Sequence, residues 1–163
     1  MDSVTKPHTL FDSVIITGSD RCANGLRVAR VSTEPLSVDE HVRAVSSAEH
    51  GAIVTFIGQV RDHDPDASGR VVALDYSAHP DAPGILLDIV SRIEAENPDV
   101  SVAVSHRIGR LGVGDLALVA AVASAHRADA FTACERLIET IKQELPVWKE
   151  QFESSGSSSW VGL

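Results

Sequence analysis

Two lysines near the end of the chain have side chains that can move protons. The chain has eleven arginines but only three lysines, and Lys142 and Lys149 lie seven residues apart. A desolvated ammonium group can lose its proton near neutral pH, whereas a guanidinium group cannot. The use of lysine at both positions therefore indicates proton transfer, although two ordinary solvated lysines explain the composition equally well.

The sequence around these two lysines differs. Lys142 falls in the expected last turn of a helix, where a cation is favourable without any function. Lys149 follows Trp148 at the start of an expected strand, shortly after the helix-ending Pro146. Such a rigid setting can fix an ammonium group beside a pocket. Lys149 is therefore the stronger candidate for chemistry.

Arg61 closes the apolar run of residues 52–60, which contains Gly58. A glycine inside a strand lets a ligand or another backbone come close, and an arginine at the strand end can hold an anion in a two-pronged contact. A β-bulge followed by a solvated arginine explains the same residues. On the residues alone, this simpler interpretation is preferred.

A second cationic pair, His126 and Arg127, follows the apolar run 116–123 and the expected helix N-cap Ser124. Free backbone N–H groups and the positive end of the helix dipole favour an anion at such a position. Cations in a first helical turn oppose the dipole unless an anion is bound, so a phosphate or carboxylate site is favoured over a plain N-cap.

Composition excludes several classes of function. The chain has 163 residues and a net charge of -9, which fits one compact domain and argues against a nucleic-acid partner. No membrane helix or signal peptide is expected, so the expected location is the cytoplasm. The histidines and the two cysteines, Cys22 and Cys134, form no ligand spacing. No metal and no cofactor are expected.

Apolar periodicity and turn residues predict alternating strands and helices. Strands are expected at 26–31, 52–60, 71–76, 100–105, 116–123 and 147–152, with a closing strand at 160–161. One helix is expected from the capping box at Ser37 to about Glu49, and Gly51 ends it. Two further helices are expected from 80 to 97 and from Ser124 to Pro146. The buried stripe of the last helix is expected to contain Phe131, Cys134, Ile138, Ile141 and Leu145. The prediction is a single-domain α+β fold with a mixed, mainly antiparallel sheet, at 26–163, after an extension at 1–25.

Five motifs in order resemble one family, the large (catalytic) subunit of molybdopterin synthase, also called the MoaE family. They are GAIVTFIGQVR at 51–61, LDYSAHP at 74–80, SHRIGRLGVGD at 105–115, SAHRADAF at 124–131 and LPVWKEQF at 145–152. The likeness covers about residues 30–162. It implies an α/β-hammerhead fold that forms a homodimer and binds a ubiquitin-like small subunit at each end, as a heterotetramer. The thiocarboxylated Gly-Gly tail of that subunit donates sulfur to cyclic pyranopterin monophosphate, which makes the dithiolene of molybdopterin.

The resemblance also implies roles for particular residues. Arg61, His126 and Arg127 bind the anionic groups of the substrate, and Lys142 and Lys149 serve catalysis and substrate contact. The remaining substrate-binding positions are Gln59, Val60, Glu150 and Gln151. Relatives often carry a basic residue and then glutamate after the second lysine, and Glu150-Gln151 departs from that pattern.

Spacing along the last helix predicts that two copies of the chain share each site. Arg127 and Lys142 are fifteen residues apart, or about 22 Å at 1.5 Å per residue. If both contact one small substrate, the anion site of one copy must meet the lysines of the other across a two-fold axis. Two alternatives are a non-catalytic module that binds an anion or a protein tail, and a small phosphoesterase using His126. The lysine pair favours the sulfurtransferase over the first, and the absence of a second base disfavours the other.

Overall fold

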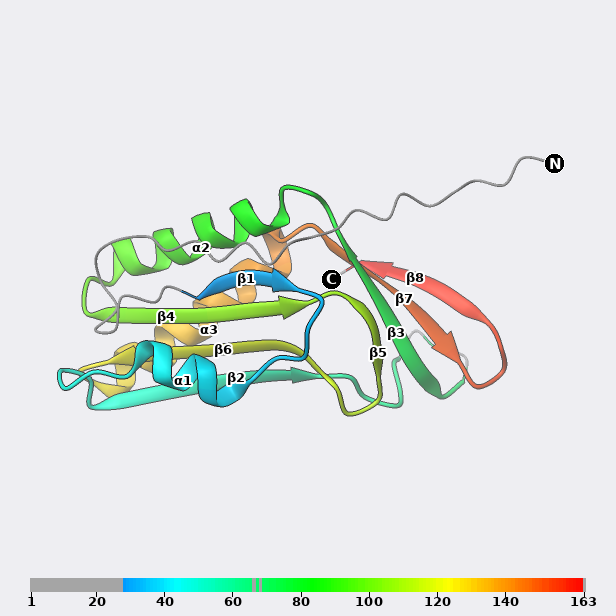
Figure 1. Cartoon of the computed structure of the whole chain (residues 1–163), viewed down its shortest axis with the longest axis horizontal. Coiled ribbons are helices and arrows are strands. Elements are labelled where there is room, and N and C mark those ends of the chain that lie inside the picture. The colour runs from blue at the N-terminus through cyan, green and yellow to red at the C-terminus, as the bar shows by residue number, and fades with distance from the viewer. Residues whose placement is uncertain (1–27, 66, 68, 163) are drawn as a thin grey trace.

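The computed structural model describes residues 28–65, 67 and 69–162 (Figure 1). The expected extension at 1–25, with Cys22, lies outside the described residues, as does the start of the strand expected at 26–31. The described chain forms the strands β1 (Ala29–Ser32), β2 (Ala52–Gln59), β3 (Val71–Ala78), β4 (Val100–Arg107), β5 (Gly109–Gly112), β6 (Leu116–Ser124), β7 (Val147–Glu153) and β8 (Ser158–Gly162). Its helices are α1 (Val38–Val45), α2 (Ala82–Glu96) and α3 (Arg127–Glu144).

The strands form two four-stranded sheets. The first has the order β1-β4-β6-β2, and the second has the order β5-β3-β7-β8. Among the described strands, β1 and β4 are the one parallel pair, and all other pairs are antiparallel. The prediction of a single-domain α+β fold with mainly antiparallel strands is therefore confirmed, with the strands divided between two sheets.

Helices cover both faces of the first sheet. α2 and α3 pack on one face, and α1 packs on the other (Figure 1). β4 and β6 are buried along almost their whole length between these layers, which explains why β6 is apolar on both faces. β4 is apolar on one face and carries the small polar residues Ser101 and Ser105 on the face toward α1. On the α1 side the contacts are with small side chains, Ala103, Ala121 and Ala123. Alanine at these positions lets the short helix lie close to the sheet.

A buried histidine joins α1 to β4. His41 is completely buried, with Nδ1 2.7 Å from the carbonyl oxygen of Ser37 and Nε2 2.8 Å from the hydroxyl of Ser105. Burial lowers the pKa of His41, since a charged ring is disfavoured away from water. This histidine therefore has a structural role that its sequence context does not reveal.

The first helix is shorter than predicted. It ends at Val45 rather than near Glu49, because the backbone of Ser46 leaves the helical conformation. The Ser46 hydroxyl then donates to the carbonyl oxygen of Val42, one of the carbonyl groups left unpaired at the helix end. Gly51 has another role than ending this helix. A Cβ added there would lie 2.7 Å from the carbonyl oxygen of Ala125, so glycine allows the close approach of the two segments.

Two predictions about α3 are wrong. Ser124 is not the N-cap but the last residue of β6, paired with Ala52 and Val100, and the N-cap is His126. Phe131 does not belong to the buried stripe, since 63% of its surface is exposed. The buried face instead consists of Ala130, Ala133, Cys134, Leu137, Ile138 and Ile141. Ala130 and Ala133 belong to this face, but their small side chains do not stand out in the sequence. The prediction was therefore built on the larger Phe131, which lies off the buried face.

The second sheet lies beyond the ends of β2, β4 and β6 (Figure 1). α3 leads through Leu145 and Pro146 directly into β7, which is central in this sheet. The end of β2 and the middle of β7 thereby meet beside the junction of the two sheets. No helix in the described part of the chain is long and apolar enough to cross a lipid bilayer.

Candidate functional site

A small pocket lies where the end of β2 meets the second sheet. Its cavity measures about 90 Å³. The residues that line it come from β2, the loop that follows, β3 and β7: Gln59, Val60, Arg61, His63, Asp64, Val71, Leu74, Tyr76, Lys149 and Gln151. Five of the nine predicted site residues are thus brought together here, although they are about ninety residues apart in the sequence.

A β-bulge and a set of backbone hydrogen bonds shape the end of β2. The register with β6 shifts between Gly58 and Gln59. The N–H of Val60 then donates to the carbonyl oxygen of Asp115, and the N–H of Gly114 donates to that of Val60. Because Val60 is buried and fixed on both sides, Arg61 is held at the rim of the pocket with its side chain exposed.

Alternation along β7 decides which of its residues face the pocket. Lys149 and Gln151 lie two residues apart on the same face, and both line the cavity. Glu150 points to the other face, where its neighbours across the sheet are Asp75 and Trp160. The structure therefore does not bring Glu150 to this pocket.

Lys149 is held by a carboxylate. Its Nζ donates to Oδ2 of Asp64 at 3.1 Å, and the two side chains are 18% and 11% exposed. Tyr76 is opposite Lys149 across the sheet and lines the same pocket. Its pKa is raised by burial and, to a smaller extent, by the nearby charge of Asp64. The pocket thus combines two cations, one carboxylate and a neutral phenol.

The floor of the pocket rests on a buried histidine. The rings of Tyr76 and His106 meet edge to face, with centroids 5.3 Å apart at 72°. Burial lowers the pKa of His106 from 6.5 to about 4, partly opposed by a hydrogen bond with the carbonyl oxygen of Arg107. Near neutral pH, the ring of His106 is therefore uncharged.

His106 makes the fold sensitive to mild acid. Between about pH 6.5 and pH 4 the unfolded chain binds a proton at this ring and the folded chain does not. The contribution of His106 to the free energy of unfolding is therefore fully present above about pH 6.5 and is lost as the pH is lowered. From pH 7 to pH 5 the loss from this one group should be about 2 kcal/mol. Urea unfolding of the wild type and of His106→Gln at both pH values measures it, because only the wild type should show this component.

The other cationic residues lie elsewhere in the chain. His126 and Arg127 are exposed at the start of α3, beside the Ala52 end of β2, whereas Arg61 follows the Gln59 end. Seven residues of strand separate these ends, or roughly 23 Å. Lys142 is exposed in the last turn of α3 and does not line the pocket. One chain alone therefore does not bring the predicted residues together.

Sequence reasoning missed His63, Asp64 and Tyr76. The loop at 61–69 is rich in aspartate, which is the only signal for Asp64, and its pairing with a lysine 85 residues later is not readable from spacing. Tyr76 lies in the motif LDYSAHP, where an aromatic residue in a strand is more often part of a core. Its two roles, in the core and in the pocket floor, are visible only in the structure.

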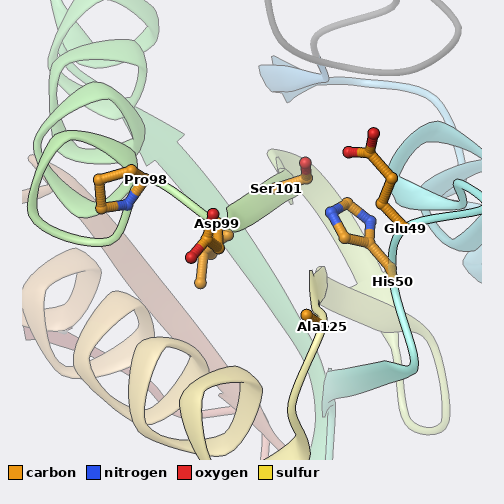
Figure 2. A pocket seen from close by; sticks show the side chains of 7 residues that line it. Glu49, His50, Pro98, Asp99, Ser101 and Ala125 are labelled. Carbon is orange, nitrogen blue, oxygen red and sulfur yellow. The ribbon is translucent and has the colours of Figure 1, made fainter.

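A second pocket of about 200 Å³ lies at the opposite end of the first sheet. Figure 2 shows its lining, in which Glu49, His50 and Asp99 point toward a common space beside Ser101 and Ala125. Two carboxylates make this pocket unsuited to an anionic substrate. Within the described ranges, no three His, Cys, Asp or Glu side chains lie close enough together to bind a metal ion.

Comparisons with known proteins agree with the motifs. The family model described as "MoaE protein" matches residues 31–144. Molybdopterin synthase catalytic subunit 1 of Mycobacterium tuberculosis is 46% identical over 82% of this chain and 89% of its own length, and the catalytic subunit of Bacillus subtilis is 39% identical over 81% and 83%. The crystal structure of molybdopterin synthase from Staphylococcus aureus matches with a TM-score of 0.76 at 33% identity, over 82% of this chain and 96% of that one.

Proposed function

This chain belongs to the MoaE family of molybdopterin synthase catalytic subunits, and on that basis we propose how it transfers sulfur. The donor is the thiocarboxylated Gly-Gly tail of a ubiquitin-like small subunit, and the acceptor is cyclic pyranopterin monophosphate. The observation that carries the proposal is the pocket that joins Arg61 to the half-buried Lys149. The proposed location is the cytoplasm, where a free thiol such as that of the buried Cys134 stays reduced.

Charge in the pocket suits an anionic substrate. Arg61 is exposed at the rim, where its planar guanidinium group can bind two phosphate oxygens at once. Fixed cations beside a reacting phosphate stabilise the charge that develops in the transition state, typically by several kcal/mol. Lys149 lies deeper, beside Tyr76, where water is largely excluded.

The reaction requires two sulfur transfers. In each, the thiocarboxylate sulfur attacks a side-chain carbon of the pterin, forming a carbon–sulfur bond and leaving the tail attached as a thioester. Water then cleaves the bond between the acyl carbon and sulfur, so the sulfur stays on the pterin and the tail leaves as a carboxylate. At one of the two carbons the bond that breaks is the carbon–oxygen bond to the cyclic phosphate, which opens to a phosphate monoester. At the other carbon the side-chain oxygen leaves as water. Lys149 orients the thiocarboxylate and moves protons, and Lys142, exposed in the last turn of α3, assists from outside the cavity.

A second copy of the chain completes the site in this proposal. The cavity of about 90 Å³ is far smaller than the roughly 300–1,000 Å³ of typical ligand sites. A two-fold axis near the middle of β2 places the Ala52 end of one copy beside the Gln59 end of the other. His126 and Arg127 of the second copy then face Arg61 of the first. The exposed ring of Phe131, in the second turn of α3, is available for contact with that second copy.

Mass spectrometry of the pterin tests this function. The chain is mixed with cyclic pyranopterin monophosphate and a thiocarboxylated small subunit, and a small subunit with an ordinary carboxylate tail is the control. We expect a product with two added sulfur atoms in the first mixture and unchanged pterin in the second. Tight binding of both partners without sulfur in the pterin would instead identify a non-catalytic binding module.

A further inference from the structure

The ion pair between Asp64 and Lys149 is unusual among the ion pairs of the described chain. Most of the others lie on the surface, for example Arg136 with Glu96, whose side chains are 59% and 48% exposed. Exposed pairs of that kind contribute little to stability. In contrast, Asp64 and Lys149 are largely removed from water, and they join a loop to a strand 85 residues later.

The loop that carries Asp64 is itself anchored at both ends. The N–H of Val71 donates to the carbonyl oxygen of Asp62 at 2.9 Å, and this backbone hydrogen bond joins the two ends of the loop. The side chains of Asp62 and Arg70 also form an ion pair, but both are exposed, so this pair contributes little to holding the loop. Within the loop, the N–H of Ala67 donates to the carbonyl oxygen of Asp64. The loop that carries Asp64 is therefore closed by backbone hydrogen bonds, which limit where the Asp64 carboxylate can lie relative to Lys149.

We propose that Asp64 is a positioning residue for the reaction, which acts through Lys149. A lysine side chain has four flexible carbons, and its ammonium group occupies one place only when a partner holds it there. The carboxylate of Asp64 fixes the Lys149 ammonium group over the pocket floor formed by Tyr76. This inference rests on the sulfur transfer proposed above, because that reaction is what gives the position of the Lys149 ammonium group its importance.

The pocket offers a second place from which a carboxylate can reach Lys149. Gln151 lies on the same face of β7, lines the same cavity and is 99% buried, and its Nε2 has no hydrogen-bond partner in the described chain. The change Gln151→Glu keeps the size of this side chain and replaces the unpaired nitrogen by a carboxylate oxygen. A glutamate there can therefore substitute for Asp64 as the partner of Lys149.

Steady-state kinetics with matched variants test the proposal. Asp64→Asn should lower kcat by roughly 10- to 100-fold, because a misplaced group costs about this much, with KM for the pterin changed by less than about threefold. The control is Asp62→Asn, which removes a carboxylate from the same loop but one that pairs with the exposed Arg70. The control should keep wild-type kcat. The double variant Asp64→Asn with Gln151→Glu should recover at least about tenfold of the lost kcat.

A measurement independent of turnover accompanies the kinetics. The chain has only three lysines, so the side-chain NMR signals of Lys149 can be assigned by replacing Lys142 and Lys6 with arginine. In the wild type, the Lys149 ammonium protons should exchange slowly with water, and Asp64→Asn should make this exchange at least about tenfold faster. Asp62→Asn should leave it unchanged.

The outcomes separate this inference from the proposed function. If the wild type makes no molybdopterin, the proposed function fails, and the NMR exchange rates still decide whether Asp64 holds Lys149. If the wild type is active, the inference is overturned when Asp64→Asn keeps wild-type kcat. It is also overturned when kcat falls but the added Gln151→Glu gives no recovery, since the aspartate would then act by another route.

Discussion

Replacement of Lys149 by alanine is expected to lower the rate of molybdopterin formation by roughly 10²- to 10⁴-fold, the range over which a positioned proton-transfer group contributes. The expected cause is the loss of the ammonium group that contacts the thiocarboxylate. Lys149 is 18% exposed and lines the pocket with Arg61. The rate is measured by quantifying the product in the presence of excess thiocarboxylated small subunit.

The fold should survive this change, because the backbone of β7 pairs with β3 and β8 whatever the side chain at 149. Arg136→Ala is the matched control, since it removes a cation from an exposed position on α3 that pairs with Glu96. This control should keep the wild-type rate within about twofold. Wild-type sulfur transfer by a folded Lys149→Ala chain would contradict the assignment.

Mixed dimers should regain activity that neither parent has. Arg127→Ala and Lys142→Ala chains are each expected to be inactive, because each removes one half of every shared site. In a mixed dimer, one site combines Arg127 from one copy with Lys142 from the other, and the second site lacks both. Random exchange makes half of the dimers mixed, so the mixture should show about one quarter of wild-type activity. The activity of the mixture is measured after exchange is verified by native mass spectrometry.

A chain that carries both substitutions is the control for this experiment. In a dimer with a wild-type chain, each site then lacks either Arg127 or Lys142, so the mixed dimer should be inactive. An equal mixture with wild type should therefore keep about one quarter of the activity, rather than the half expected if each chain worked alone. Absence of complementation in verified mixed dimers would contradict a shared site.

Much of the fold was predictable because several of its strands are long apolar runs in the sequence. The runs at 52–60 and 116–123 correspond to β2 and β6, and the extended segment after Pro146 corresponds to β7. The ends of elements were less predictable, because they depend on the backbone conformation of single residues. α1 ends where the backbone of Ser46 becomes extended, and nothing in the spacing of apolar residues indicates this.

Five residues of the candidate pocket could be selected from motifs, whereas its geometry and its residues His63, Asp64 and Tyr76 could not. Arg61 and Lys149 could be selected from motifs, whereas their meeting depends on how the two sheets are joined. The separation of Arg61 from His126 follows from the antiparallel register of β2 and β6, which places Ala52 opposite Ser124. Periodicity gives the strands without their partners, so this register could not be derived from the sequence.

The most direct test of a shared cationic site is a structure of the dimer with cyclic pyranopterin monophosphate bound. The expected result is a phosphate within hydrogen-bond distance of Arg61 in one copy and of His126 or Arg127 in the other, with the pterin side chain beside Lys149. A phosphate bound by residues of one copy alone, or a pterin in the pocket formed by Glu49, His50 and Asp99, would contradict it.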